Sequence, residues 1–215
     1  MTPAARIAAA IAILDRELRG EAAEAVLTSW ARGNRYAGSG DRAAIRDLVY
    51  EALRCRASYA AIGGSLTGRG LMLGYCAAQA IDPKTVFTGE RFAPEALSEG
   101  ERMPATVPDG LEALDCPTWV APLLQESLGA DFAPVMAAQR QRAPVFLRVN
   151  LARVTRPEAQ AALAAEGVGT RPCDGVSSAL EVVENARKIR TCGAYLNGYV
   201  ELQDRSSQSM VEALP

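Results

Sequence analysis

The first part of the chain repeats apolar residues with the period of an α-helix. In three consecutive stretches the apolar side chains recur three or four positions apart, which places them along one face of a helix. The three faces are Ile7, Ala10, Ile11, Leu14 and Leu18; Ala22, Ala23, Val26, Leu27 and Trp30; and Ile45, Leu48, Val49, Ala52 and Leu53. Pro3 suits a first helical turn and Gly33 a helix end, and we expect Ser39 or Asp41 to cap the third helix.

The pattern then weakens and returns. A loop punctuated by glycines covers residues 63–70, and residues 71–81 are apolar on most sides, which predicts a buried helix. Between residues 82 and 116, seven prolines and glycines interrupt every period, which predicts a loop-rich connection with one or two short helices. The helical pattern of apolar residues returns at Pro117. We expect its apolar residues to face inward, and Asp131 to cap a further helix; those apolar residues are Trp119, Leu123, Leu124 and Leu128.

From Pro144 the period changes from that of a helix to that of a strand. Residues 145–151 alternate between apolar positions and the positions of Phe146, Arg148 and Asn150, as in a half-buried strand. Residues 155–158 have capping-box spacing and open a helix that stops at Gly167. Two further strands are predicted, at residues 179–183 and 199–202. We therefore predict an α+β fold, with a helical domain at residues 1–141 (loop-rich connection 82–116) and a small βαββ subdomain at 142–215.

A last helix follows the third strand. Asp204 is placed to cap it, and Met210, Val211 and Leu214 form its apolar stripe. A strand and helix of this kind normally lead to the edge of a following sheet. We therefore expect the chain to be the front part of a larger protein.

Composition excludes several classes of function. The net charge is −2, so a nucleic-acid role requires a local basic patch. The longest apolar run, residues 8–14, is far too short to span a bilayer, and no signal sequence opens the chain, so we expect a cytoplasmic protein with no membrane partner. Five scattered cysteines argue against disulfides and zinc, and the absence of histidine excludes Ser-His and Cys-His catalysis within the chain. We expect no metal site.

Two groups of arginines are candidates for RNA contact. Residues 132–157 contain no acid but include Arg140, Arg142, Arg148, Arg153 and Arg156. Arginine forks suit phosphates, and Phe146 and Asn150 lie on the same strand face as Arg148, where they could stack on and hydrogen-bond to bases. The second group lies in the helical part, among several acids, and includes Arg42, Arg46 and Arg54. For both groups the alternative is a solvated face, or, for the first, a surface that packs against another domain.

Several motifs, taken together, resemble a known family. They are Pro144-Val-Phe-Leu-Arg-Val-Asn150, Thr155-Arg-Pro-Glu158, Gly198-Tyr-Val-Glu-Leu-Gln-Asp-Arg-Ser-Ser-Gln208, and in the helical half Asp41-Arg-Ala43 and Leu48-Val-Tyr-Glu-Ala-Leu-Arg54. They resemble the RNA (cytosine-5-)methyltransferase family of the Sun/Fmu type, in particular its bacterial members that act on small-subunit ribosomal RNA. The resemblance implies a NusB-like helical domain and an RRM-like subdomain. A Rossmann-like domain would follow, with the S-adenosylmethionine site and two catalytic cysteines.

The sequence departs from that family in lacking the last domain. Pro172-Cys173 and Thr191-Cys192 match the family's catalytic dipeptides, but Asp174 and Gly193 follow them in place of serine. We interpret both cysteines as small buried residues and expect no catalytic residue in this chain. In the family, residues matching Asp204, Ser206, Ser207 and Gln208 flank the cofactor domain, whereas on physical grounds they open a helix. S-adenosylmethionine is thus implied for the whole enzyme and not for this chain.

The leading hypothesis is that the chain is the RNA-recognition part of an S-adenosylmethionine-dependent 16S ribosomal RNA cytosine-5 methyltransferase, without the catalytic domain. Its partners would then be small-subunit ribosomal RNA and its own catalytic domain. The alternatives are a stand-alone NusB-like RNA-binding or antitermination-type module without enzymatic activity, and a scaffold whose arginines meet acidic protein partners.

Overall fold

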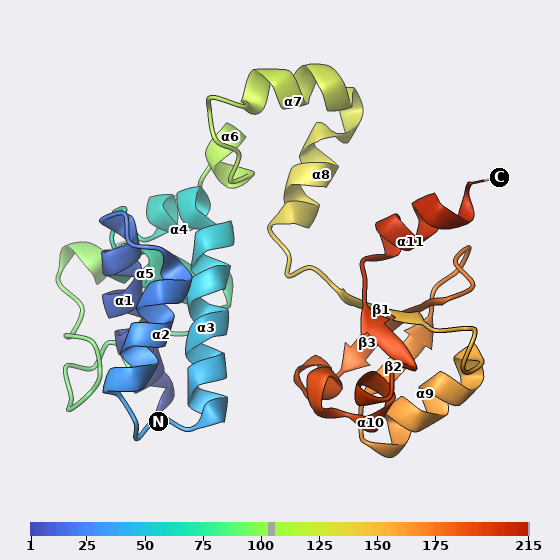
Figure 1. The fold of residues 1–215 in the computed structure, drawn as a ribbon. Helices are drawn as coiled ribbons and strands as arrows, with labels where there is room; N and C mark the ends of the chain where they lie inside the picture. The colour runs from blue at the N-terminus through green and yellow to red at the C-terminus, as the bar shows by residue number, and fades with distance from the viewer. Residues whose placement is uncertain (103–105, 215) are drawn as a thin grey trace. The chain divides into compact units, whose positions relative to one another are not determined.

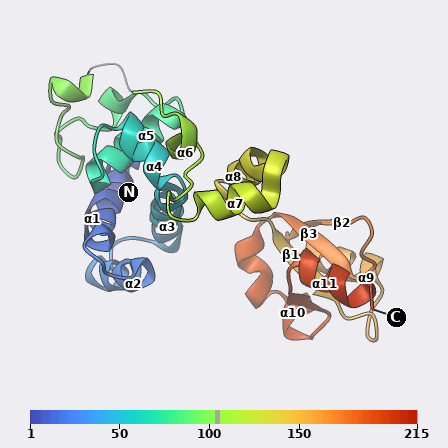
Figure 2. The same cartoon turned by 90° about the horizontal axis from the view of Figure 1, so that it is seen from above.

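The computed structural model describes residues 1–102 and 106–214 as two compact units, Met1–Arg142 and Ala143–Pro215 (Figure 1). The first unit is helical in its described residues, and the second holds a four-stranded sheet. Figure 2 shows the same elements turned by 90°. In the described part of the chain, no helix is both long and apolar enough to cross a membrane.

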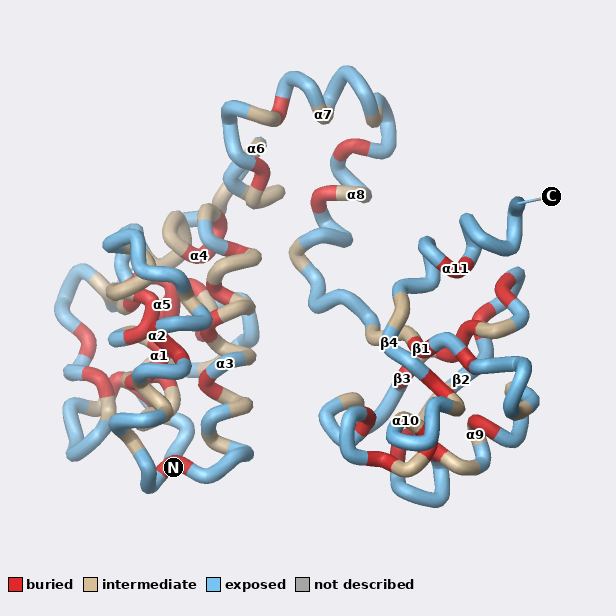
Figure 3. The backbone as a smooth tube through the Cα atoms, viewed as in Figure 1, coloured by how far each residue is buried: buried red, intermediate tan, exposed pale blue. Residues whose placement is uncertain are grey.

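The main core of the first unit is built by five helices. They are α1 (Pro3–Leu18), α2 (Ala23–Gly33), α3 (Ser39–Arg54), α4 (Arg56–Ile62) and α5 (Gly68–Ala78). The predicted apolar faces supply its fully buried side chains, among them Leu14, Val26 and Ile45. Helix α4, which the sequence did not predict, adds Tyr59 to this core. Figure 3 shows buried positions concentrated on the inward sides of these helices.

The cap predicted for α3 is wrong. The N-cap residue is Gly38, and no side chain caps the helix. Asp41 instead accepts from the Met1 ammonium at 3.1 Å and pairs with Arg6 at 2.8 Å. Both of these partners lower the pKa of the Asp41 carboxyl, the ammonium more. Two cations stabilise the Asp41 carboxylate more than backbone N–H groups would. Asp41 therefore binds these cations and does not cap the helix.

Two glycines of α5 mark close helix packing, although the sequence analysis assigned Gly68 to a loop. A Cβ on Gly74 would lie 2.2 Å from the carbonyl oxygen of Tyr59 in α4. A Cβ on Gly68 would lie 2.3 Å from the carbonyl oxygen of Ile11 in α1. Real Cβ contacts are never that short, so α1 and α4 approach α5 as closely as they do only because these positions lack a side chain.

The connection after α5 is anchored to the core. Phe87 and Leu97 are buried in it. Arg69 donates to the carbonyl oxygens of Glu95 at 3.0 Å and Ala96 at 3.1 Å, and pairs with Glu101 at 2.6 Å. Hydrogen bonds from Arg69 first, and then from the backbone N–H and hydroxyl of Ser98, lower the pKa of Glu101 to about 2. This segment includes the short helices Pro83–Thr85 and Gly100–Arg102, and α6 (Gly110–Ala113) follows.

A second, smaller cluster forms around α7 (Ala121–Leu128) and α8 (Phe132–Gln139), which the short helix Gly129–Asp131 joins. Leu124 and Leu128 pack on it as predicted, but Trp119 is 79% exposed and Leu123 65% exposed. Two short helices bury one stripe against each other, and the wider stripe predicted here exceeds what this small cluster covers. Asp131 occupies the N-cap position of α8 without a side-chain hydrogen bond.

The second unit is a four-stranded antiparallel sheet, and two of its helices pack against one face of the sheet. Its elements are β1 (Val145–Val149), α9 (Arg156–Ala165), β2 (Gly169–Pro172), β3 (Ala179–Glu184), a 3-10 helix (Ala186–Thr191), α10 (Gly193–Leu196), β4 (Val200–Leu202) and α11 (Arg205–Glu212). The strand order is β2-β3-β1-β4, and every pairing is antiparallel. The capping box at Thr155 and Glu158 is present, as predicted. Strand β2 and helix α10 were not predicted, because neither carries an alternating or helical apolar stripe.

Candidate nucleic-acid interface

Strand β1 separates the core from the candidate interface. Leu147 and Val149 are buried in the core of the second unit, on the face that α9 and α10 contribute to. Successive side chains on a strand point to opposite faces, so Phe146 and Arg148 lie on the other side of the sheet. Sequence reasoning predicted this division, and the structure confirms it for β1.

Two arginines on this face of the sheet form ion pairs with acids of the neighbouring strands. Arg148 lies opposite Glu201 of β4 and forms an ion pair with it. Arg171 of β2 lies opposite Glu181 of β3 and pairs with it at 2.8 Å. No acid lies near Arg148 in the sequence, but the pairing of β1 with β4 brings Glu201 next to it. This face is therefore close to neutral where we predicted a positive strand, although such exposed pairs are weak and leave the guanidinium groups accessible.

Phe146 is less available for stacking than predicted. Its ring is half-buried and packs against a small cluster of Cys173, Val176 and Ala179. These residues belong to the β2–β3 hairpin and its loop, and nothing in the sequence links them to Phe146. On the sheet face opposite the core, these apolar residues therefore already cover part of the Phe146 ring.

Three other candidates bind backbone carbonyls of neighbouring loops. The side-chain amide of Asn150 donates to the carbonyl oxygen of Gly198 at 3.2 Å. Arg153 donates to that of Asn197 at 2.7 Å. Arg156 donates to that of Val176 at 3.3 Å. Asn150 and Arg153 remain exposed while they fix the turn after β1 against the turn before β4.

Arg140 is a structural residue of the first unit. Its guanidinium pairs with Asp115 at 2.8 Å and donates to the carbonyl oxygen of Ala113 at 2.9 Å and to the Ser58 hydroxyl at 3.2 Å. Asp115, whose side chain is 4% exposed, also accepts from the backbone N–H and hydroxyl of Ser58 at 2.8 and 2.7 Å. This cluster joins α4 to the end of α8. Neither Ser58 nor Asp115 carries a sequence signal for the role.

The remaining arginines of the predicted set differ in their surroundings. Arg142 pairs with Asp47 at 3.3 Å, Arg46 with Glu24 at 2.7 Å, and Arg54 with Glu51. Arg42 is exposed, and its side chain has no hydrogen bond or ion pair among the residues that the structure describes.

The residues near α11 hold that helix in place. Asp204 caps it through the backbone N–H of Ser206 at 2.8 Å, as predicted, and Ser206 and Ser207 are exposed. Gln208 is 2% exposed; its amide donates to the carbonyl oxygens of Leu147 and Gln203 at 3.3 and 3.0 Å, and its oxygen accepts from a serine hydroxyl at 3.0 Å. Gln208 therefore fastens α11 to the sheet.

The predicted apolar stripe of α11 does not face this core. Met210 is 71% exposed, Val211 62% and Leu214 69%. The buried contact of α11 is made by the polar Gln208, which the period of apolar residues could not reveal.

Both cysteines in family-like dipeptides are buried and free. Burial is the largest influence on Cys173 and raises the pKa of its thiol. Cys192 donates to the carbonyl oxygen of Ile189 at 3.0 Å. A buried thiol with a raised pKa is a poor nucleophile, which agrees with a structural role for Cys173.

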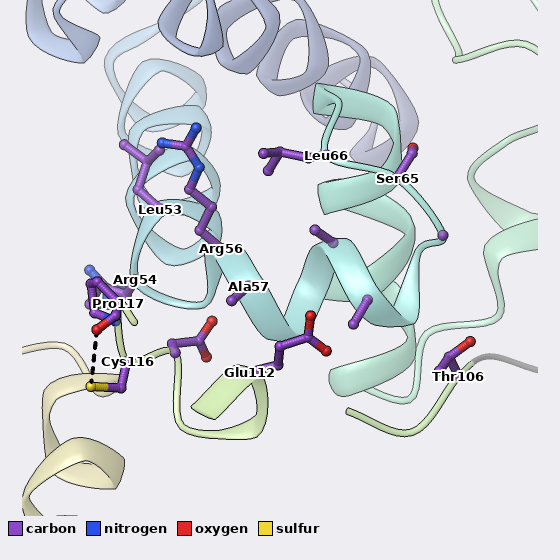
Figure 4. Close-up of a pocket in the computed structure, with 14 residues that line it drawn as sticks. Leu53, Arg54, Arg56, Ala57, Ser65, Leu66, Thr106, Glu112, Cys116 and Pro117 are labelled. Carbon is purple, nitrogen blue, oxygen red and sulfur yellow. Dashed lines mark hydrogen bonds between the residues drawn. The ribbon is translucent and has the colours of Figure 1, made fainter. Parts of the chain in front are cut away.

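The first unit also contains a groove of about 720 Å³ (Figure 4). Three small residues of α4, Ala57, Ala60 and Ala61, line it, together with Arg56 and, from the other side, Glu112. Charges of both signs line the groove. In the described part of the chain, no three His, Cys, Asp or Glu side chains gather as a metal site requires.

Comparisons with known proteins find similarity over part of the chain. Residues 116–189 match the family described as "Methyltr_RsmF/B-like, ferredoxin-like domain". A stretch of 92 residues, 43% of this chain, is 33% identical to ribosomal RNA small subunit methyltransferase B of Vibrio cholerae serotype O1 (strain ATCC 39315 / El Tor Inaba N16961) and covers 21% of it. The crystal structure of PH0851 resembles 96% of this chain with a TM-score of 0.56 at 14% identity, over 54% of its own length.

These matches support the predicted fold class and the predicted family to different extents. The likeness to PH0851 concerns the fold alone, and the chain spans only part of each relative. The predicted α+β class is confirmed, and the antiparallel sheet has four strands where the sequence predicted three. Over the part that matches, the chain is a relative of the Sun/Fmu-type RNA methyltransferases.

Proposed function

We propose that this chain recognises small-subunit ribosomal RNA for a methyltransferase that modifies cytosine at C5 with S-adenosylmethionine. The observation that carries the proposal is the match of residues 116–189 to the RsmF/B-like ferredoxin-like domain, supported by 33% identity to a ribosomal RNA methyltransferase. In this proposal the helical unit is NusB-like. The methyl donor and the catalytic cysteines belong to a domain other than the two described here.

The chemistry of the chain's own residues supports a binding role. Cytosine C5 methylation requires a thiolate that attacks the base, and the two cysteines in suggestive dipeptides are buried. By contrast, exposed guanidinium groups are placed to meet phosphates. In the second unit the candidates are Arg148, whose ion pair with Glu201 can open toward a phosphate, and Arg153 beside Asn150.

The test is RNA binding by the purified 215-residue chain. Fluorescence anisotropy with a labelled hairpin of small-subunit ribosomal RNA, at several salt concentrations, should show binding that weakens as salt rises. Arg148→Ala and Arg153→Ala should each weaken binding and make the salt dependence shallower by about one unit or less. The matched control is Arg91→Ala, which removes an exposed arginine of the other unit. Absence of binding by the wild-type chain would refute the proposal.

A second measurement separates recognition from catalysis. Calorimetric titration of the chain with S-adenosylmethionine should show no micromolar binding, and labelled methyl should not be transferred to ribosomal RNA. Methyl transfer by this chain would contradict the proposal that catalysis belongs to another domain.

A further inference from the structure

The turn between α2 and α3 presents an exposed tyrosine among arginines. We name Arg32, Arg35, Tyr36 and Arg42 the α2–α3 corner; all of them are exposed, Tyr36 by 72%. The turn is well anchored. The side chain of Asn34 donates to the carbonyl oxygen of Trp30 at 2.8 Å, and Ala37 is buried. With Ala37 held inward, the neighbouring tyrosine is left on the surface.

The arginines of this corner differ from most others in the chain. Among the described residues, ten other arginines form ion pairs with acids, and one of them, Arg6, shares its acid with the chain's amino terminus. The guanidinium groups of the three corner arginines have no hydrogen bond or ion pair within the described residues. An exposed guanidinium with no acid partner can bind an external anion without first breaking an internal contact.

Three acids lie near the corner in sequence, and each is already engaged. Asp47 pairs with Arg142 at 3.3 Å. Asp41 binds the Met1 ammonium and Arg6, at 3.1 and 2.8 Å. Glu24 accepts from Arg46 at 2.7 Å and from the Tyr50 hydroxyl at 3.0 Å. The positive charge of the corner is therefore not cancelled by these three neighbours, and the surface should attract a polyanion.

The combination of side chains selects the kind of polyanion. Three guanidinium groups provide forks for phosphates, and an exposed phenol ring offers a face on which an unpaired base can stack. A duplex has its bases stacked already and would leave the tyrosine without a partner, and an acidic protein would use the charges but not the ring. We infer that the α2–α3 corner binds a single-stranded segment of RNA, with the arginines on phosphates and Tyr36 stacked on a base. This inference rests on the proposed function and locates a contact of the helical unit.

Binding assays on the full chain test this assignment. The variants are Tyr36→Ala, Tyr36→Phe and the triple variant Arg32→Gln/Arg35→Gln/Arg42→Gln. A second triple variant, Arg19→Gln/Arg91→Gln/Arg102→Gln, removes the same charge from other exposed positions. The ligand is a fluorescein-labelled single-stranded segment of small-subunit ribosomal RNA, and anisotropy is measured over a salt series.

The expected pattern is specific to the corner. Tyr36→Ala should weaken binding about 5- to 150-fold, the range that loss of one stacked base implies, and Tyr36→Phe should retain nearly all affinity. The corner triple variant should make the salt dependence shallower by up to about two units, at roughly 0.7 per lost phosphate contact, and the control triple variant should change it less. If wild type binds RNA and the corner variants bind like the control, the inference is wrong while the proposed function stands. If wild type does not bind, both are wrong.

Crosslinking gives an independent readout. RNA that carries 4-thiouridine is irradiated with the wild-type chain, which is then digested with trypsin. Cleavage after Arg35 and Arg42 places Tyr36 on a short peptide, residues 36–42. The RNA adduct should appear on this peptide. Adducts found only on other peptides would contradict the assignment.

Discussion

Replacement of Arg140 by alanine should destabilise the first unit far more than it changes RNA binding. Arg140 lies in the basic stretch that the sequence singled out for RNA. The substitution leaves Asp115, 4% exposed, as a carboxylate without its cation, and removes two hydrogen bonds, to Ala113 and Ser58. Loss of one partner of a buried ion pair costs about 3–5 kcal/mol, and the partial exposure of Arg140, 31%, reduces this to roughly 2–4 kcal/mol.

The matched control is Arg142→Ala. Arg142 pairs with Asp47, but the two side chains are 60% and 45% exposed, so the change should cost at most about 0.5 kcal/mol. Thermal unfolding followed by circular dichroism should show the first unit's transition lowered by roughly 6–12 °C for Arg140→Ala and by little for Arg142→Ala.

A double-mutant cycle tests the physical reason. Asp115→Asn removes the charge that Arg140 neutralises, so the combined variant should be less destabilised than the sum of the two single variants. Equal transitions for Arg140→Ala and Arg142→Ala, or strict additivity with Asp115→Asn, would refute the buried-pair reasoning and return Arg140 to the RNA candidates.

Three other variants probe features outside that cluster. Gly74→Ala should destabilise the first unit by at least about 3 kcal/mol in urea unfolding, because its Cβ would meet the Tyr59 carbonyl, whereas Gly40→Ala, which meets nothing within 4 Å, should be neutral or stabilise by up to about 1 kcal/mol. Glu101→Gln should lower stability by about 1–2 kcal/mol above pH 5; since the folded pKa is about 2 and the unfolded value 4.5, the difference from wild type should disappear as the pH falls toward 2. Gln208→Ala should expose α11 to hydrogen exchange and proteolysis, while Ser207→Ala, at an exposed position, should not.

What could be predicted from the sequence was local. The capping box at Thr155 and the cap at Asp204 involve side chains and N–H groups two or three residues apart, so their spacing alone reveals them. The apolar faces of α1 to α3 were likewise readable from their period. The two-unit reading rests on the change of period near Pro144.

What could not be predicted depends on distant partners. Arg148 meets Glu201 only because β1 and β4 pair, and the partners lie 53 positions apart in the chain. The resemblance places Gln208 in a motif that flanks the cofactor domain. In the structure its side-chain amide is buried and forms three hydrogen bonds, and the spacing of residues in the sequence does not reveal these partners. The sequence therefore predicted which side chains of β1 are buried and which are exposed, but not the acids that pair with the arginines of the exposed face.

The glycines of α5 also have a consequence for the order of folding. Each glycine disfavours an isolated helix by about 1 kcal/mol relative to alanine, and α5 contains Gly68, Gly70 and Gly74. An eleven-residue segment with three of them should not hold a helix in water by itself. Its helix is stabilised by α1 and α4, whose backbones lie where side chains would otherwise be. We therefore expect α5 to become helical only after those two helices have formed, so that substitutions in it accelerate unfolding and leave the folding rate nearly unchanged.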